Sequence, residues 1–302
     1  MWLSSRAPDH VVAPVSEMRP ATPVQRPGNA RPRDDQEPKV EPPSREELEH
    51  IERHLASLPA HSGATITDSP ELGALLVQSS GKGPGLNYAA LPRWAPETWR
   101  ESLERVVVQM RARGDWPSLL LADRLDRPLG LADQLTRLGW QAMARETVLW
   151  VGRASVVPHL DPSLRIEAVQ PRSAADHERI ERQVFGLPER ESRERVETLG
   201  HALEAGRLRA YIVRIGDEPV AVARLSQGEG VAGLYGIGVV ENRRRQGLGT
   251  LITTVATRAG MAMGNRVVWL SVEDVNPGAR LMYERLGFAP AFGWARWMAL
   301  PG

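Results

Sequence analysis

The sequence predicts an α+β fold, a mixed central sheet flanked by helices, with two copies of that fold in tandem. The length of 302 residues corresponds to two domains of about 150 residues each. Over residues 163–302, predicted strands come first and then alternate with helices, an order typical of a mixed sheet. The pattern Leu-Thr-Arg-Leu-Gly-Trp at 135–140 recurs as Tyr-Glu-Arg-Leu-Gly-Phe at 283–288, each time between a buried strand and a final strand. This repeat indicates a duplication.

The first 43 residues are predicted to form a disordered, proline-rich tail. They hold nine of the 24 prolines and a single aromatic residue, Trp2, and their six basic and six acidic side chains cancel. Such a segment buries too little apolar surface to offset the entropy lost on ordering. Order is expected from Ser44, which forms a capping box with Glu47 at the start of a helix that ends near Pro59.

Residues 44–157 are predicted to form the first copy and residues 163–302 the second, joined by a linker at 158–162. Helical periodicity and glycine stops predict the helices, and short apolar or alternating runs predict the strands. In the first copy, further helices are expected at 97–113 and 131–138, and strands at 119–122 and 147–151. In the second copy, strands are expected at 165–169, 209–215, 219–225, 233–240, 267–272 and 294–299, and helices at 174–185, 188–204, 247–263 and 277–286.

The composition excludes several classes of protein. Lysine and arginine number 38 against 37 acidic residues, so the formal net charge is +1, and no basic excess points to a nucleic-acid partner. The chain has no cysteine, which removes disulfides, thiolate catalysis and thiolate zinc sites. No apolar run approaches ~18 residues. We therefore expect a cytoplasmic protein with no metal and no membrane partner.

A strand followed by a glycine-bearing loop and a long helix, residues 238–250, carries the most chemical information. Gly247 and Gly249 remove Cβ atoms that would keep an anion from the backbone amides, and a helix N-terminus offers free donors and a partial positive charge. Arginines at 243–245 lie beside it. The dinucleotide fingerprint fails because Ile252 stands where its third glycine should be, and no phosphate-binding G-x-x-x-x-G-K-[ST] pattern occurs.

The pattern that remains is R-x-x-G-x-G, filled by Arg244, Gly247 and Gly249, and here the sequence resembles the GNAT superfamily of acyl-CoA-dependent N-acetyltransferases. The resemblance covers roughly residues 164–300. It is strengthened downstream by the family spacing N-x-x-A-x-x-x-Y-x-x-x-G-F, met by the segment from Asn276 to Phe288. One departure is Glu241, where the family often has proline; it brings an acid near the phosphates and leaves the backbone donors unaffected.

The resemblance implies a role for each residue around this loop. Residues expected to bind acetyl-CoA, the cosubstrate, are Val239, Val240, Arg244, Arg245, Gln246, Gly247, Leu248, Gly249, Thr250 and Asn276. The amide of Val239 would polarise the thioester carbonyl and stabilise the oxyanion. Tyr283 would be the general acid that protonates the CoA thiolate. Tyr283 as a core tyrosine, and Asn276 as only a helix cap, stay open alternatives.

The general base is not determined by the sequence. An amine near pH 7 is mostly protonated, so a group must take its proton, directly or through a water. The carboxylates considered are Glu229, Glu241, Glu273 and Asp274, although each of them taken singly is more simply interpreted as a solvated surface residue.

The first copy resembles the same family only weakly, as a degenerate GNAT-like domain. Pro92 and Pro96 flank the place where its loop should be, and neither can donate a hydrogen bond. The repeat also sets Leu135 opposite Tyr283. A copy without phosphate donors or a proton donor should be structural, or should cover the acceptor site.

The predicted function is transfer of an acetyl group from acetyl-CoA to an amine acceptor, in particular a small molecule, by direct attack. The alternative is a non-catalytic acyl-CoA-binding or regulatory module; the intact Arg244, Gly247, Gly249 and Tyr283 favour the enzyme. Tandem members of the family include mycothiol synthases, and nothing in the sequence selects that substrate. The acceptor, the acyl-chain preference and the oligomeric state are left open.

Overall fold

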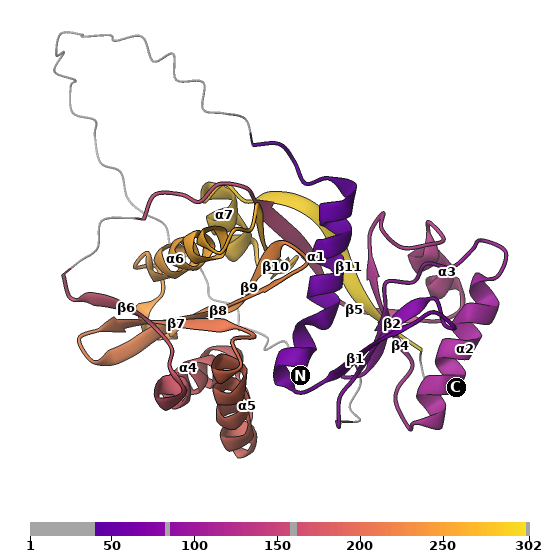
Figure 1. Ribbon diagram of the computed structural model, residues 1–302, viewed down its shortest axis with the longest axis horizontal. Coiled ribbons are helices and arrows are strands. Elements are labelled where there is room, and N and C mark those ends of the chain that lie inside the picture. The colour runs from indigo at the N-terminus through magenta and orange to yellow at the C-terminus, as the bar shows by residue number, and fades with distance from the viewer. Residues whose placement is uncertain (1–39, 82–84, 158–161, 300–302) are drawn as a thin grey trace, which may run out of the picture.

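The computed structural model describes residues 40–81, 85–157 and 162–299 (Figure 1). Most of the predicted tail and of the predicted linker, residues 1–39 and 158–161, therefore lies outside the described residues. The α-helices are α1 (Arg45–Ser57), α2 (Trp99–Ala112), α3 (Leu131–Arg137), α4 (Ala174–Phe185), α5 (Ser192–Glu204), α6 (Leu248–Ala262) and α7 (Pro277–Arg285). None of the helices in these ranges has both the length and the hydropathy needed to cross a bilayer.

The strands of the described residues form one mixed sheet that runs through the whole molecule. They are β1 (Thr65–Ser69), β2 (Ala74–Gln78), β3 (Tyr88–Ala90), β4 (Ser118–Ala122), β5 (Gln141–Val151), β6 (Leu164–Ala168), β7 (Arg209–Ile215), β8 (Glu218–Gly228), β9 (Val231–Val239), β10 (Val267–Glu273) and β11 (Ala289–Met298). Their order across the sheet is β1-β2-β3-β4-β11-β5-β10-β9-β8-β7-β6. The predicted mixed sheet flanked by helices is thus confirmed.

The first half of the chain comprises α1 to α3 and β1 to β5, and the second half comprises α4 to α7 and β6 to β11. The two halves exchange their last strands. β5, which ends the first half, lies against β10 of the second half, and β11, which ends the second half, lies against β4 of the first. β5 and β11 also pair with each other, so each half completes the sheet of the other. The junctions match: the amide of Asp123, after β4, donates to the carbonyl of Gly293 at 2.8 Å, and that of Asp274, after β10, donates to the carbonyl of Arg145 at 3.0 Å. This correspondence is the structural counterpart of the sequence repeat.

Helices cover the sheet of the second half on both faces. On one face, α1 from the first half lies beside α4 and α5, and the indole Nε1 of Trp269 on β10 donates to Nδ1 of His54 on α1 at 3.2 Å (Figure 1). On the other face lie α6 and α7; a Cβ added at Gly260 of α6 would lie 3.1 Å from Val268. Because side chains alternate along a strand, Trp269 and Val268 point to opposite faces.

The aromatic core at the junction explains why α1 docks on the second half. Trp150 from β5, Trp269 from β10 and Phe292 from β11 pack with Ile51 and Leu55 on the apolar face of α1. All are at least nine-tenths buried. A fully buried side chain of this size contributes roughly 1.5–3 kcal/mol, so the cluster holds the halves together.

Element bounds depart from prediction mostly in the first half and at the exchanged strands. The strands β1, β2 and β3 lie in a stretch where no strand was predicted. The strand predicted at 147–151 begins at Gln141, and the strand predicted at 294–299 begins at Ala289. The added residues of β5 are exposed or half-buried and carry no alternating pattern; they are strand because β11 pairs with them. The helix predicted to end near Pro59 ends at Ser57 and passes into a 3₁₀ turn, Leu58–Ser62.

Candidate functional site

The neighbouring strands β9 and β10 separate half-way along their length. They pair in parallel from Val231 to Leu234 and from Val267 to Leu270, and no further. Beyond these pairs most residues are half-buried, whereas all the paired ones are buried; Gly238 and Val272 are the buried exceptions. Gly236, with φ of 59°, lies in a register shift between β8 and β9 that bends β9 at this point. Residues 235–239 of β9 and 271–273 of β10 no longer pair with each other, and we call these two segments the splay.

The backbone of β9 presents an amide to the splay. The amide of Val240 donates to the carbonyl of Val220 on β8 at 3.0 Å. Consecutive residues of a strand direct their backbone groups to opposite edges, so the groups of Val239 point away from β8. Its carbonyl indeed accepts from the side chain of Arg244, at 3.2 Å, on that side. Val240, by contrast, has its amide bonded and its side chain buried in the core.

The loop between β9 and α6 ends in a helix terminus without a side-chain cap. Gly247 is the N-cap with φ of 79°, a left-handed conformation that favours glycine, and no side chain bonds the first-turn amides. An α-helix leaves its first amides without an internal partner, so those of Leu248, Gly249 and Thr250 are free to bind an anion. The side chain of Leu248 is buried, so only its backbone is accessible.

Charge at the loop is shared unequally among its arginines. Arg243 bonds Glu218 of β8 at 2.8 Å and is thereby neutralised. Arg244 and Arg245 are exposed, as are Glu241 and Gln246. The two exposed guanidinium groups outweigh the single carboxylate, so the loop presents a positive surface.

Three elements converge at Gly249. A Cβ added there would lie 3.1 Å from Sδ of Met282 on α7 and 3.8 Å from Cγ2 of Val239 on β9. The start of α6, the middle of α7 and the end of β9 therefore meet on one face of the sheet. The loop residues predicted from the sequence thus lie together next to the splay.

On α7, Asn276 and Tyr283 both have structural roles. Oδ1 of Asn276 accepts from the amide of Ala279 at 3.1 Å and so caps the helix, with Pro277 in its first turn. Tyr283 is 6% exposed, packs in the core and has its ring centroid 6.0 Å from that of Phe288. Burial raises the pKa of Tyr283 to about 12, so its hydroxyl keeps its proton at neutral pH. The Asn276 cap leaves its Nδ2 group available.

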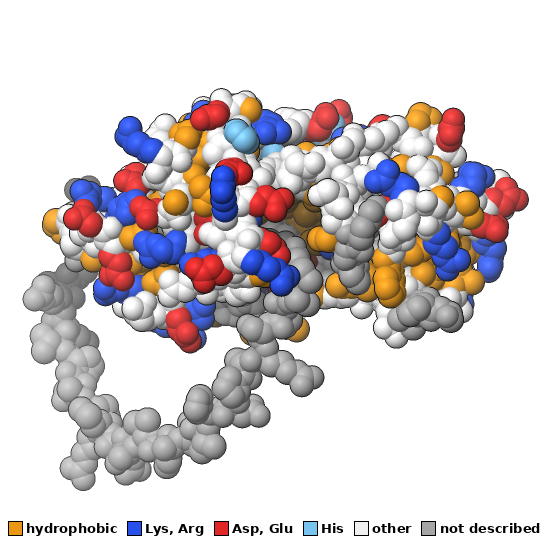
Figure 2. Space-filling view, turned by 90° about the horizontal axis from the view of Figure 1, so that it is seen from below, with side chains coloured by type: hydrophobic (Ala, Val, Ile, Leu, Met, Phe, Trp, Pro, Cys, Tyr) orange, Lys and Arg blue, Asp and Glu red, His pale blue; other side chains and the backbone are white. Residues whose placement is uncertain are grey.

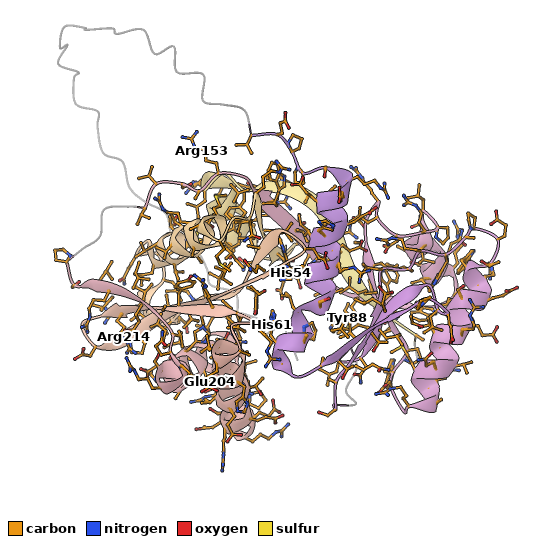
Figure 3. The ribbon with its side chains drawn as sticks, viewed as in Figure 1. His54, His61, Tyr88, Arg153, Glu204 and Arg214 are labelled. Carbon is orange, nitrogen blue, oxygen red and sulfur yellow. The ribbon has the colours of Figure 1, made fainter. Side chains whose placement is uncertain are left out.

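On the opposite face, the first half contributes side chains beside the splay. Nδ1 of His61 lies 2.8 Å from the hydroxyl of Tyr235 on β9. On the far side of the splay, Trp294 Nε1 donates to Ser271 Oγ at 2.8 Å, and Ser271 donates to Glu146 of β5 at 2.6 Å. Figure 3 marks His61 between the halves, and Figure 2, which looks onto the α4 and α5 side, shows the surface hollowed there.

Sequence reasoning missed Glu146, Ser271, Tyr235 and His61. Glu146 and His61 belong to the half without a recognised motif, and no local signal connects them to residues more than 120 positions away. Of the carboxylates that were considered, Glu229 lies in the β8–β9 turn at the paired end of β9, so it is remote from the splay.

The counterpart of the splay in the first half is closed. Beyond β3 the chain still pairs with the segment that follows β4. The amide of Trp94 donates to the carbonyl of Arg127 at 3.3 Å, and the amide of Arg127 donates to the carbonyl of Pro92 at 3.1 Å. The indole of Trp94 is buried and donates to the carbonyl of Leu72 at 2.7 Å. The segment after β4 therefore occupies the opening that β9 and β10 leave free.

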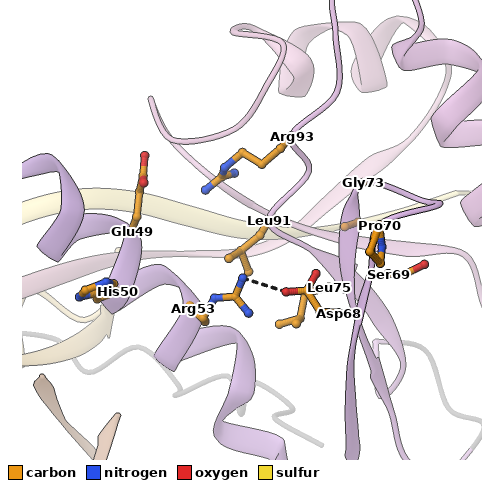
Figure 4. A pocket seen from close by; sticks show the side chains of 11 residues that line it. Glu49, His50, Arg53, Asp68, Ser69, Pro70, Gly73, Leu75, Leu91 and Arg93 are labelled. Carbon is orange, nitrogen blue, oxygen red and sulfur yellow. Dashed lines mark hydrogen bonds and ion pairs between the residues drawn. The ribbon is translucent and has the colours of Figure 1, made fainter. Parts of the chain in front are cut away.

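A cavity of about 340 Å³ lies elsewhere, between α1 and the β1–β2 hairpin (Figure 4). An ion pair between Arg53 and Asp68, at 3.1 Å, lies across it. The other polar side chains of its lining are Glu49, His50, Ser69 and Arg93. This cavity is in the first half and apart from the α6 loop. Among the described residues, no group of three or more histidine or acidic side chains is placed to hold a metal ion.

Comparison with known proteins identifies the second half. Residues 175–288 match the model of the acetyltransferase (GNAT) family. No curated protein matches the chain. Among solved structures, a GCN5-related N-acetyltransferase from Kribbella flavida is similar over 84% of this chain and 97% of its own, with a TM-score of 0.63 and 22% identity.

Two further structures share the fold. A tandem GNAT protein from the clavulanic acid biosynthesis pathway is similar over 76% of this chain and 79% of its own, with a TM-score of 0.58 and 14% identity. A GCN5-related N-acetyltransferase from Sphaerobacter thermophilus matches over 83% and 92%, with a TM-score of 0.57 and 14% identity. The similarity extends over both halves, so the tandem GNAT fold predicted from the repeat is confirmed. Residues 175–288 of this chain form the domain that matches the acetyltransferase (GNAT) family.

Proposed function

We propose that the second half transfers an acetyl group from acetyl-CoA to the amine of a small molecule by direct attack. The observation that carries the proposal is the uncapped N-terminus of α6, which lies beside the splay under two exposed arginines. Free amides at a helix start and nearby guanidinium groups suit a pyrophosphate. The proposed contacts are those of Arg244, Arg245 and Gln246 with the backbone of residues 247–250.

Each remaining residue of the site then has a role. The amide of Val239, directed into the splay, would donate to the thioester carbonyl and stabilise the oxyanion as the amine attacks. Nδ2 of Asn276, which its cap leaves available, would bond the pantetheine arm. Tyr283, protonated at neutral pH, would give its proton to the departing thiolate.

The first half supports a small acceptor over a protein. α1 and the 3₁₀ turn that follows it lie over the face of the sheet opposite α6, and His61 contacts Tyr235 at the splay. An acceptor on this face must therefore enter between the two halves. A compact amine meets that restriction more easily than a folded protein.

The experiment measures free-thiol release from acetyl-CoA with a panel of primary amines: an alkylamine, an arylethylamine, an amino sugar, an amino acid and a lysine-containing peptide. Calorimetry with CoA is run in parallel. The proposal expects CoA binding together with amine-dependent thiol release. Binding without release by any amine would favour the alternative, a non-catalytic acyl-CoA-binding module.

A further inference from the structure

We infer that Glu146, a residue of the first half, accepts the proton of the acceptor amine in the reaction of the second half. The inference rests on the proposed function. Strand exchange places Glu146 of β5 directly opposite Glu273 of β10, at the end of β10 that has left β9. The carboxylate thus belongs to the wall of the splay although it lies in the degenerate copy.

Glu146 lies on the face opposite the α6 loop. Trp269 points to α1, and Ser271 and Glu273 follow at two-residue intervals along β10, so they share that face. Directly paired residues of antiparallel strands project to the same side, which places Glu146 with Glu273. A cosubstrate held by α6 would reach the splay from one face, and an amine would meet it from the face of Glu146.

The carboxylate is held in one orientation. Ser271 Oγ accepts from the indole of Trp294 at 2.8 Å, and it donates its own hydrogen to Oε2 of Glu146 at 2.6 Å. Within the described part of the chain, no hydrogen bond reaches Oε1 of Glu146. One oxygen is therefore fixed and the other remains available to an amine.

The surroundings of Glu146 make it a stronger base than an exposed glutamate. Burial raises its pKa, the hydrogen bond from Ser271 lowers it, and Glu273 raises it again. Arg296 of β11 and Asp274 act more weakly and in opposite directions. A general base is most effective when its pKa lies near the working pH, so the net upward shift suits the role.

The neighbouring carboxylates are less suited. Asp274 is occupied, since it accepts from Thr147 Oγ1 at 2.7 Å and lies 3.6 Å from Arg145. Glu241 is exposed on the loop beyond the end of β9. Glu181 of α4 lies beside Gly236 of the splay, but it is buried in an ion pair with Arg224. Among the described carboxylates near the splay, Glu273 is therefore the remaining rival, and the Glu273→Gln variant separates it from Glu146.

The proton balance of the step closes. The ammonium form of the acceptor gives a proton to Oε1 of Glu146, and the nitrogen lone pair forms the bond to the thioester carbon. A second nitrogen proton is lost to solvent as the tetrahedral intermediate collapses and the carbon–sulfur bond breaks. The thiolate takes the proton of Tyr283. Glu146 then releases its proton to water and Tyr283 regains one, which leaves an amide and a free thiol.

The test replaces Glu146 by glutamine. Glu146→Gln keeps the shape and can still accept from Ser271, but it cannot take a proton. With the best amine of the panel, kcat should fall ~10²-fold or more. The acidic limb of the kcat/KM profile, set by this carboxyl, should disappear. CoA affinity and the melting temperature should stay near those of the parent, as should all properties of the control Glu229→Gln.

Two further variants test whether a carboxylate at position 146 suffices and whether Glu273 is the base instead. Glu146→Asp, which retains a carboxylate, should keep the acidic limb with intermediate kcat, and it serves if the glutamine variant does not fold. Near-parent kcat and an intact limb in Glu146→Gln, or a large loss only in Glu273→Gln, would overturn the inference while leaving the proposed function standing. A parent protein that releases no thiol with any amine would contradict both the inference and the proposed function.

Discussion

The hydroxyl of Tyr283 is protonated at neutral pH, as an ordinary phenol is, and its burial makes it hold that proton more tightly. Packing in the core removes water from the phenol, which disfavours its charged form and raises its pKa to about 12. The same packing means that the ring also supports α7 through its contact with Phe288. A core role and an acid role are therefore compatible in one residue, and only removal of the hydroxyl separates them.

Tyr283→Phe keeps the ring and deletes the hydroxyl. If Tyr283 is the general acid, kcat for thiol release should fall ~10²-fold or more under conditions where chemistry limits the rate. Affinity for acetyl-CoA and the melting temperature should barely change. The matched control is Tyr211→Phe, a buried tyrosine of β7 that should behave as the parent. A Tyr283→Phe variant with parent-like kcat would transfer the protonation of the thiolate to water or another group.

The N-terminus of α6 can bind an anion because no side chain occupies the amides of its first turn. The N-cap is a glycine in a left-handed conformation and offers no side-chain oxygen to the first turn. Gly249 keeps that turn close to Met282 and Val239 without steric conflict. An anion can therefore reach the backbone directly, which a side chain at this position would prevent.

Gly249→Glu places a side chain and a negative charge at that approach. Loss of two charge-assisted hydrogen bonds of about 1.5 kcal/mol each predicts CoA binding weaker by on the order of 100-fold. The added Cβ meets the flexible end of Met282 and lies at an ordinary contact distance of 3.8 Å from Val239, so the melting temperature should be nearly kept. Calorimetry and thermal unfolding measure the two quantities. Gly200→Glu on α5, where a Cβ meets nothing within 4 Å, is the control, and equal CoA affinities in the two variants would discard the loop assignment.

The docking of α1 on the second half predicts a pH-dependent stability. His54 is buried between them, accepts from Trp269 at Nδ1 and lies 2.9 Å from Ser226 Oγ at Nε2. Desolvation lowers the pKa of His54 from 6.5 to about 4. Because the folded pKa is the lower one, the unfolded chain binds the proton first as the pH falls. The stability is full above pH 6.5 and is lost progressively towards pH 4.

His54→Gln, which can keep both hydrogen bonds, tests this coupling. The pKa difference corresponds to about 3 kcal/mol of unfolding free energy. Denaturant unfolding at pH 7 and pH 4 should therefore show a smaller acid-induced loss in the variant, by an amount of that order. The two proteins are compared at the same pH values, so carboxylates that titrate in both cancel. Identical pH dependence in parent and variant would contradict the assignment.

Over the whole molecule, the exchange of β5 and β11 makes the two halves one structural unit. Each half supplies a strand to the sheet of the other, and the aromatic cluster around Trp150 and Trp269 draws residues from both. The halves have nevertheless diverged at corresponding places. The second half keeps β9 and β10 apart beyond Leu270, whereas Arg127 and Trp94 close the first.

This asymmetry predicts one CoA site per chain. Isothermal titration with CoA should give a stoichiometry of one, and the Gly249→Glu variant should show no comparable second site. The physical reason is that Pro92 and Pro96 lack amides to donate, while Trp94 fills the space beside β3. A stoichiometry of two would show that the first half retains a site of its own.

The sequence by itself determined most elements of the second half and the loop that joins β9 to α6. The helix predicted at 174–185 and the strand predicted at 209–215 have the bounds of α4 and β7. The capping box at Ser44 and the cap at Asn276 also form as predicted. These features depend on periodicity, caps and glycine stops within a few residues of one another, so the local pattern contains the information.

Only the tertiary structure decided which strands lie together and what faces the splay. Nothing in the pattern of 141–151 or 289–298 indicates that each strand joins the opposite half, because an antiparallel partner can come from any distance along the chain. The hydrogen bond between the side chains of Ser271 and Glu146, 125 residues apart, follows from that exchange alone. The raised pKa of Glu146 has the same origin, since burial of a carboxyl is a property of the packed sheet and not of its neighbours in sequence.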